Sequence, residues 1–127
     1  EFINLIKISN ISYGFMKKGR CLGFVICLRE NTNYQSTNYK FFQKRHTKFF
    51  YIDRIAIANE YQSSGIGSNL YSKLLSIKDT FNIPICAEVN IDPPNESSIN
   101  FHRKHGFTEI TESSIKEGYS VVYMEID

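Results

Sequence analysis

The 127-residue chain has no tryptophan, only three prolines and three cysteines, and no long apolar run. Cys21, Cys27 and Cys86 form no C-x-x-C pair, and an odd, scattered set of thiols excludes a disulfide-stapled secreted domain. No apolar stretch approaches the roughly 20 residues of a membrane-spanning helix, and no signal-peptide pattern is present. We therefore expect a soluble cytoplasmic protein without a membrane partner.

The chain also lacks a strong excess of charge of either sign, because 15 Lys and Arg are nearly balanced by 13 Asp and Glu, for a net charge of +2. The longest basic stretch, residues 44–48, lies between aromatic pairs, and we expect it to be a solvated loop or strand end. Nucleic acid is therefore not an expected partner. Ten Phe and eight Tyr supply enough bulk for a core, and the length predicts one domain over residues 1–127.

Hydrophobic patterning predicts a mixed α/β (α+β) fold. Apolar residues recur every three or four positions over 66–81, which indicates one face of a helix, and a second helix over 96–105 follows an Asn cap. Residues 30–40 are polar and predict a long loop. Strands are expected at residues 11–16, 21–28, 49–57, 85–91, 107–111 and 119–126.

The segment 62–68, Gln-Ser-Ser-Gly-Ile-Gly-Ser, joins a buried strand to the first of these helices. Free N–H groups at a helix start attract anions, and glycines let a phosphate approach the backbone. A nucleotide P-loop is disfavoured because no Lys follows Gly67. A dinucleotide fingerprint is weakened by Leu70 in place of a third small residue, although Glu88 suits its acidic position. A plain strand-to-helix turn remains an alternative.

Two spaced motifs resemble the GNAT acetyltransferases. Residues 55–67 resemble the family's strand, turn and pyrophosphate loop with the pattern Q/R-x-x-G-x-G/A, matched by Gln62, Gly65 and Gly67. Residues 95–107 resemble its N-x-x-A-x-x-F/L-Y-x-x-x-G-F helix. Residues 51–55 together with 88–95 are similar, more narrowly, to a bacterial subgroup of predicted acetyltransferases without a settled substrate.

The resemblance implies a mostly antiparallel sheet that splays apart at the cofactor site, with flanking helices and acetyl-CoA as the cofactor. The main chain of the strand before the loop would bind pantetheine, the loop amides would bind the pyrophosphate, and two residues of the second helix would face the cofactor. These cofactor-binding positions are Ile55, Ala56, Ile57, Gln62, Ser63, Ser64, Gly65, Ile66, Gly67, Ser68, Asn95 and Ser98, with His102 beside the sulfur. No metal is expected.

The expected reaction is acyl transfer to an amine, which needs a route for the amine proton and stabilisation of the leaving thiolate. Many family members have a Tyr that acts as the acid where this chain has His102. His102 could replace it as an imidazolium that donates a proton to the thiolate, or as a neutral ring that only hydrogen-bonds. Asp53 shares strand parity with Ile55 and Ile57 and is one candidate base. Glu88 on the neighbouring strand is its rival, and a water chain without a dedicated base is the third option.

We expect an N-acetyltransferase that acts on a small-molecule or peptide amine by direct attack in a ternary complex. A catalytically weak acyl-CoA-binding module is the alternative, and a nucleic-acid-associated protein is a third hypothesis. The acceptor is expected to meet the loop 31–40, where Tyr34 and Tyr39 could wall a pocket. Residues 2–9 look like the end of a helix that precedes the first hairpin in the family, which suggests an N-terminally shortened domain. A homodimer is left open.

Overall fold

The structure, a computed structural model, describes residues 11–62 and 64–127. The expectation of a helix end at residues 2–9 lies outside the described residues, and so does Ser63. Six strands form one sheet in the order β1-β2-β3-β4-β6-β5. The strands are β1 (Ile11–Lys17), β2 (Arg20–Arg29), β3 (Phe50–Ile57), β4 (Ile85–Asp92), β5 (Thr108–Lys116) and β6 (Tyr119–Ile126).

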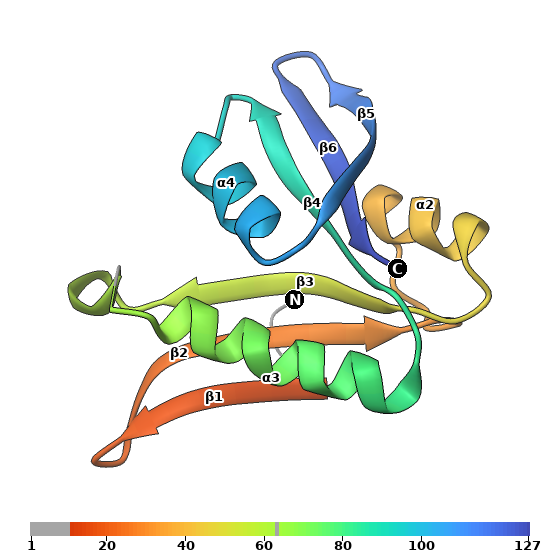
Figure 1. Ribbon diagram of the computed structural model, residues 1–127. Helices are drawn as coiled ribbons and strands as arrows, with labels where there is room; N and C mark the ends of the chain where they lie inside the picture. Colours follow the sequence, from red (N-terminus) through yellow and green to blue (C-terminus); the bar gives the residue numbers. More distant parts are fainter. Residues whose placement is uncertain (1–10, 63) are drawn as a thin grey trace.

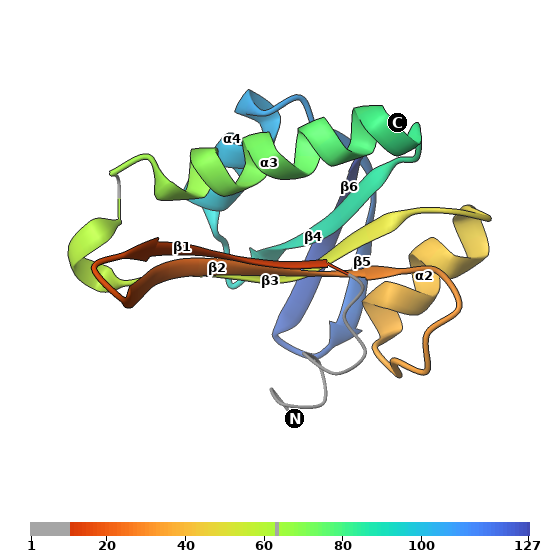
Figure 2. The ribbon, with the colours of Figure 1, turned by 90° about the horizontal axis from the view of Figure 1, so that it is seen from below.

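The helices lie on both faces of this sheet. Helices α3 (Ile66–Phe81) and α4 (Glu96–Lys104) cover one face, and α2 (Thr37–Arg45) covers the other (Figure 2). A 3₁₀ turn, η1 (Asn59–Tyr61), follows β3. One apolar cluster, which includes Leu70 and Leu74, fills the space under α3, and a second, built around Tyr39 and Phe42, fills the space under α2. The mixed α/β fold with flanking helices is therefore confirmed.

The two helices predicted from the sequence are also confirmed. Helix α3 spans the predicted residues and presents Ile66, Leu70 and Leu74 to the core. Helix α4 begins after Asn95, whose side chain accepts a hydrogen bond from the Ser98 N–H at 3.2 Å, as an N-cap does.

The prediction of a loop over residues 30–40 is wrong in its second half, because α2 begins at Thr37. The Ser36 side chain caps this helix by accepting from the Tyr39 N–H at 3.2 Å. Tyr39 is fully buried and its hydroxyl donates to the Arg29 carbonyl at 2.5 Å, so it does not wall a pocket. The predicted solvated stretch at 44–48 likewise starts inside this helix.

The sheet opens between β3 and β4 (Figure 1). These are the only parallel neighbours in the described sheet, and they pair only at Phe50↔Ile85 and Tyr51↔Cys86. Beyond that level the two strands separate, and each carries one extra residue against its other neighbour, at Asp53 in β3 and Ile91 in β4. Such bulges bend a strand, and we attribute the splay to this pair of irregularities.

Candidate active site

A cavity of about 710 Å³ occupies the opening, bounded by β3, η1, α3 and α4. Ten of the predicted cofactor residues line it: Ile55, Ala56, Ile57, Gln62, Gly65, Gly67, Ser68, Asn95, Ser98 and His102. The three β3 residues lie beyond the last pair with β4, so β4 offers their main chain no ladder partner there. The splayed strands thus leave an extended backbone edge along the cavity.

The other end of the cavity is the N-terminus of α3. Gly65 precedes the helix with φ of 89°, a left-handed conformation that favours glycine, and no side chain of the described residues caps this terminus. The first helical bond runs from the Asn69 N–H to the Gly65 carbonyl at 2.9 Å. The N–H groups of residues 66–68 therefore have no acceptor within the helix, and this terminus suits a pyrophosphate.

Two of the predicted loop residues, Ile66 and Ser64, are not among the residues that line the cavity. The Ile66 side chain is buried in the core under α3, so only its main chain belongs to the helix start. Ser64 is exposed, and its hydroxyl hydrogen-bonds the Tyr61 carbonyl. The cavity also contains residues that sequence reasoning missed, namely Tyr61, Tyr71, Ser97, Phe101 and Lys104. Tyr71 lies one helical turn after Gly67, so helical periodicity from the glycine loop is a signal that could have found it.

His102 is 4% exposed, and both of its ring nitrogens have partners. Nδ1 lies 2.7 Å from the Ser98 carbonyl oxygen, which can only accept, so Nδ1 carries a proton. The Tyr71 hydroxyl lies 2.7 Å from Nε2. Burial lowers the pKa of His102 despite the Ser98 hydrogen bond, so the resting ring is neutral and Nε2 accepts from Tyr71.

Glu88 points to the other face of the sheet, beside Tyr51. The Tyr51 hydroxyl donates to Glu88 Oε1 at 2.5 Å. Glu88 is partly exposed as a residue, but its carboxyl group is enclosed, and this burial together with the negative charge of Asp53 raises the carboxyl pKa to about 8. The Tyr51 hydrogen bond offsets only part of that rise. Tyr51 forms the last β3–β4 pair with Cys86, and Glu88 lies two residues beyond Cys86, at the level where the sheet opens.

Asp53 does not keep the strand parity that the sequence suggested. Ile52 and Ile55 are three residues apart, yet both pack in the cluster under α3, because the extra residue in β3 interrupts the alternation. The Asp53 charge acts on both Tyr51 and Glu88. The structure therefore brings the two candidate bases into one electrostatic group at the opening.

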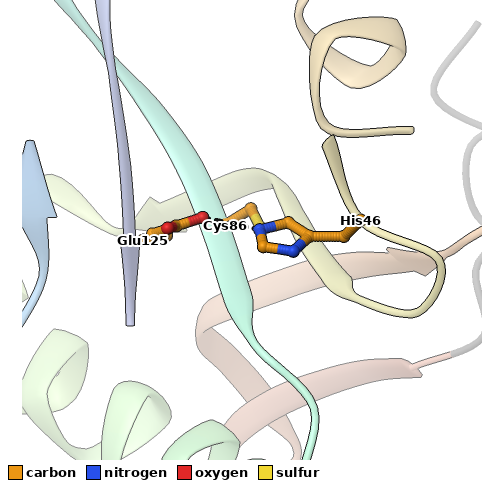
Figure 3. A group of neighbouring side chains, drawn as sticks. All are labelled: His46, Cys86 and Glu125. Carbon is orange, nitrogen blue, oxygen red and sulfur yellow. Dashed lines mark hydrogen bonds and ion pairs between the residues drawn. The ribbon is translucent and has the colours of Figure 1, made fainter. Parts of the chain in front are cut away.

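A separate cluster joins the end of α2 to β4 and β6 (Figure 3). Donor atoms of His46, Cys86 and Glu125 lie within 4.8 Å of one another, a set that could ligate a metal. Arg45 occupies the Glu125 carboxylate in bidentate fashion at 3.1 and 2.9 Å, and His46 Nε2 donates to it at 2.6 Å. Since a guanidinium already places positive charge there, we interpret the cluster as an ion-pair clasp that holds α2 to β6.

The family model of the GNAT acetyltransferases matches residues 5–107. The chain belongs to the GNAT acetyltransferase family. Membership confirms the expected acetyl-CoA-dependent acetyltransferase with acetyl-CoA as its cofactor, and it removes the P-loop and dinucleotide alternatives. No curated protein matches the chain. Within the described residues, no helix has the length and apolar character needed to cross a bilayer.

Solved structures share this fold at low identity. The ribosomal-protein-S18-alanine N-acetyltransferase from Escherichia coli has a TM-score of 0.67 at 17% identity, over 91% of this chain and 67% of that one. Naa50 of Arabidopsis thaliana, in complex with the bisubstrate analogue CoA-Ac-MVNAL, has a TM-score of 0.73 at 19% identity, over 99% and 78%. An IAA acetyltransferase from Bacillus cereus has a TM-score of 0.71 at 14% identity, over 98% and 81%.

Proposed function

We propose that this GNAT enzyme transfers the acetyl group of acetyl-CoA to a primary amine of a small-molecule or peptide acceptor, by direct attack in a ternary complex. The opening between β3 and β4, continuous with the uncapped start of α3, is the observation that supports this function. It offers one continuous site for an acyl-CoA thioester, from the main chain of β3 to the start of α3.

The residues present fit the cofactor at both ends of the cavity. The main chain of Ile55, Ala56 and Ile57 would bond the pantetheine arm and polarise the acetyl carbonyl, and the amides of residues 66–68 would hold the pyrophosphate. The amides of Gln62 and Ser64, which were also expected to do so, already donate to the Asn59 and Tyr61 carbonyls. Asn95 both caps α4 and lines the cavity, so the two roles predicted for it are compatible. Lys104 adds a positive side chain to the same wall, as a phosphate-rich ligand requires.

Glu88 is our candidate for the general base. A base works best when its pKa lies near the working pH, and the enclosed Glu88 carboxyl, with a pKa of about 8, meets that condition. Asp53 tunes this pKa through its charge, which makes it a positioning residue in our proposal. The attacking amine would lose a proton to the Glu88 carboxylate, directly or through one water, as its nitrogen bonds to the acetyl carbon.

His102 acts on the leaving thiolate through Tyr71 in our proposal. A neutral ring whose Nε2 accepts from Tyr71 has no proton there to donate, which disfavours an imidazolium acid in the resting enzyme. Burial raises the pKa of Tyr71, so its hydroxyl stays protonated. Its single proton is donated to His102 Nε2 in the resting enzyme, and the O–H would turn from Nε2 to the sulfur as charge develops there. His102 would thus position the Tyr71 hydroxyl before the reaction, and the thiolate would gain its proton from water.

The catalytically weak acyl-CoA-binding module remains the second candidate, and the neutral state of His102 is the observation in its favour. The two functions separate experimentally. Thermal melting with acetyl-CoA, with NAD as the control, tests cofactor binding. Thiol release across a panel of amines then tests turnover.

A rise in Tm with acetyl-CoA only, followed by amine-dependent thiol release, is the result we expect. Binding without release from any amine would favour the module, and no Tm shift at millimolar acetyl-CoA would refute both.

A further inference from the structure

A second cavity, of about 380 Å³, lies on the α2 face of the sheet, opposite the cofactor cavity. Helix α2 forms one wall through Thr37, Lys40, Phe41 and Lys44, and β5 forms the other through Thr111, Glu112 and Ser113. The floor is aromatic, because the Phe41 and Tyr123 rings stack with centroids 4.0 Å apart and planes 9° from parallel. We call this cavity the α2–β5 groove.

The groove lies at the level where the sheet opens. Tyr123 of β6 pairs with Glu88 of β4 on one side and with Thr111 of β5 on the other, so the three residues form one row across the sheet. Directly paired residues on neighbouring strands point to the same face, and Glu88 is close enough for its charge to act on the Tyr123 hydroxyl. One side chain, Tyr123, therefore separates the groove from the candidate base.

The α2 wall of the groove is positive. Lys40 and Lys44 are one helical turn apart and exposed, and no carboxylate of residues 11–62 or 64–127 lies within ion-pair distance of either one. The next residue, Arg45, forms an ion pair with Glu125, so its charge is already neutralised. Glu112 on the β5 wall is the one acidic residue among those that line the groove, but it pairs with Val122, which packs in the cluster under α3, so its carboxylate is directed to the other face of the sheet. Two free ammonium groups on the α2 wall therefore favour an anionic ligand.

We propose that the α2–β5 groove binds the acceptor, and that the acceptor is a peptide whose acetylated amino group is followed by an acidic side chain. This inference rests on the proposed acetyl transfer. With its amine at Glu88, an extended acceptor would cross Tyr123 and reach the lysines of α2. The step from β4 across β6 to β5 is roughly 10 Å, which matches about three residues of extended chain. The acidic residue is therefore expected at or near position three.

The test uses hexapeptides of otherwise identical neutral sequence that carry one Glu at position two, three or six, with an all-Gln peptide as reference. For the wild-type enzyme we expect kcat/KM for Glu at position three to exceed the all-Gln value by roughly tenfold. Glu at position six should give no advantage. In Lys40→Glu/Lys44→Glu the advantage of the Glu peptide over the all-Gln peptide should vanish, and the loss should appear as a higher KM for the Glu peptide. Lys48→Glu, an exposed lysine outside the groove, is the matched control.

Acetyl-CoA-dependent Tm shifts of all three proteins separate the possible failures. If the wild type shows no shift, the proposed function is wrong. If it binds acetyl-CoA but no peptide is turned over, or if all peptides react equally, the groove assignment is overturned while cofactor binding stands. An acidic preference that survives the double reversal, or is lost equally in Lys48→Glu, would also overturn it. Lys40→Gln/Lys44→Gln, which adds no repulsion, should show the same loss of preference in weaker form.

Discussion

Replacing Asp53 by Asn should shift the pH profile of acetyl transfer to lower pH without abolishing activity. In the wild type the Glu88 carboxyl, with a pKa of about 8, is ionised in only about one molecule in eleven at pH 7 and in about ten of eleven at pH 9. Turnover should therefore rise about tenfold over this range and then level off. Removing the Asp53 charge takes away one of the two causes that raise this pKa, while burial, the larger cause, remains.

The assay is kcat against pH from 6 to 10, followed by free-thiol release with saturating acetyl-CoA. Asp53→Asn should move the inflection below 8, and Glu88→Gln should remove the inflection and lower kcat about 100-fold or more. Asp79→Asn, an exposed acid on α3, is the control and should leave the profile unchanged. If Asp53→Asn abolishes turnover while Glu88→Gln keeps the inflection, Asp53 is the base and our assignment is refuted.

The raised pKa of Glu88 also predicts how the stability of the fold depends on pH. Between the unfolded value of about 4.5 and the folded value of about 8, the folded Glu88 carboxyl keeps a proton that the unfolded one has lost. The free energy of unfolding should therefore fall as pH rises through this window, by an amount on the order of a few kcal/mol. Glu88→Gln has no such proton to lose. Its Tm advantage over wild type should grow from about pH 5 to about pH 8 and stay constant above.

Three further changes test other parts of the site. Gly67→Asp should abolish the acetyl-CoA Tm shift by placing a carboxylate at the pyrophosphate, whereas Gly67→Ala, whose Cβ would lie 3.4 Å from the Phe101 ring, should retain it in weakened form. His102→Ala and Tyr71→Phe should each lower kcat roughly 10- to 100-fold with acetyl-CoA affinity within a few-fold, and unchanged kcat in either would remove that residue from our scheme. Glu125→Gln should destabilise the fold by about 1–3 kcal/mol in urea unfolding, because it breaks the clasp on α2. Glu109→Gln, in an exposed pair, should cost under about 0.5 kcal/mol, and equal losses would contradict the clasp.

The parts of the fold that the sequence predicted are those with local signals. Helix α3 follows a glycine loop and repeats apolar residues on one face, and α4 follows an Asn cap. Helix α2 has nine residues, no acidic residue in its first turn and a run of aromatics that also suits a strand. It is stabilised by burying Tyr39 and Phe42 against strands far away in the chain, and no local pattern reports that burial.

The glycine loop and the α4 motif could also be recognised from the sequence, because each depends on matching single residues to a family pattern. The Tyr71–His102 pair was not, because it joins residues 31 positions apart on two helices. The α2–β5 groove depends on α2 and therefore could not be found before that helix was seen. The features that we propose for the substrate thus lie mostly in contacts between elements, whereas those that we propose for the cofactor lie within single elements.

The two bulges explain both why the strand-parity prediction for Asp53 failed and why the sheet opens at the candidate site. Strand parity assumed an uninterrupted period of two through β3, so Asp53 was placed with Ile55 and Ile57. Whether a strand takes an extra residue is decided by its register against a neighbour, and β2 skips Asp53 when it pairs with Arg54 and Ile52. That insertion turns the following residues, and together with the extra residue Ile91 in β4 we hold it responsible for the separation of β3 from β4 along the cavity. The irregularity that invalidates the parity argument is therefore one of the two bulges to which we attribute the cleft where we place the chemistry.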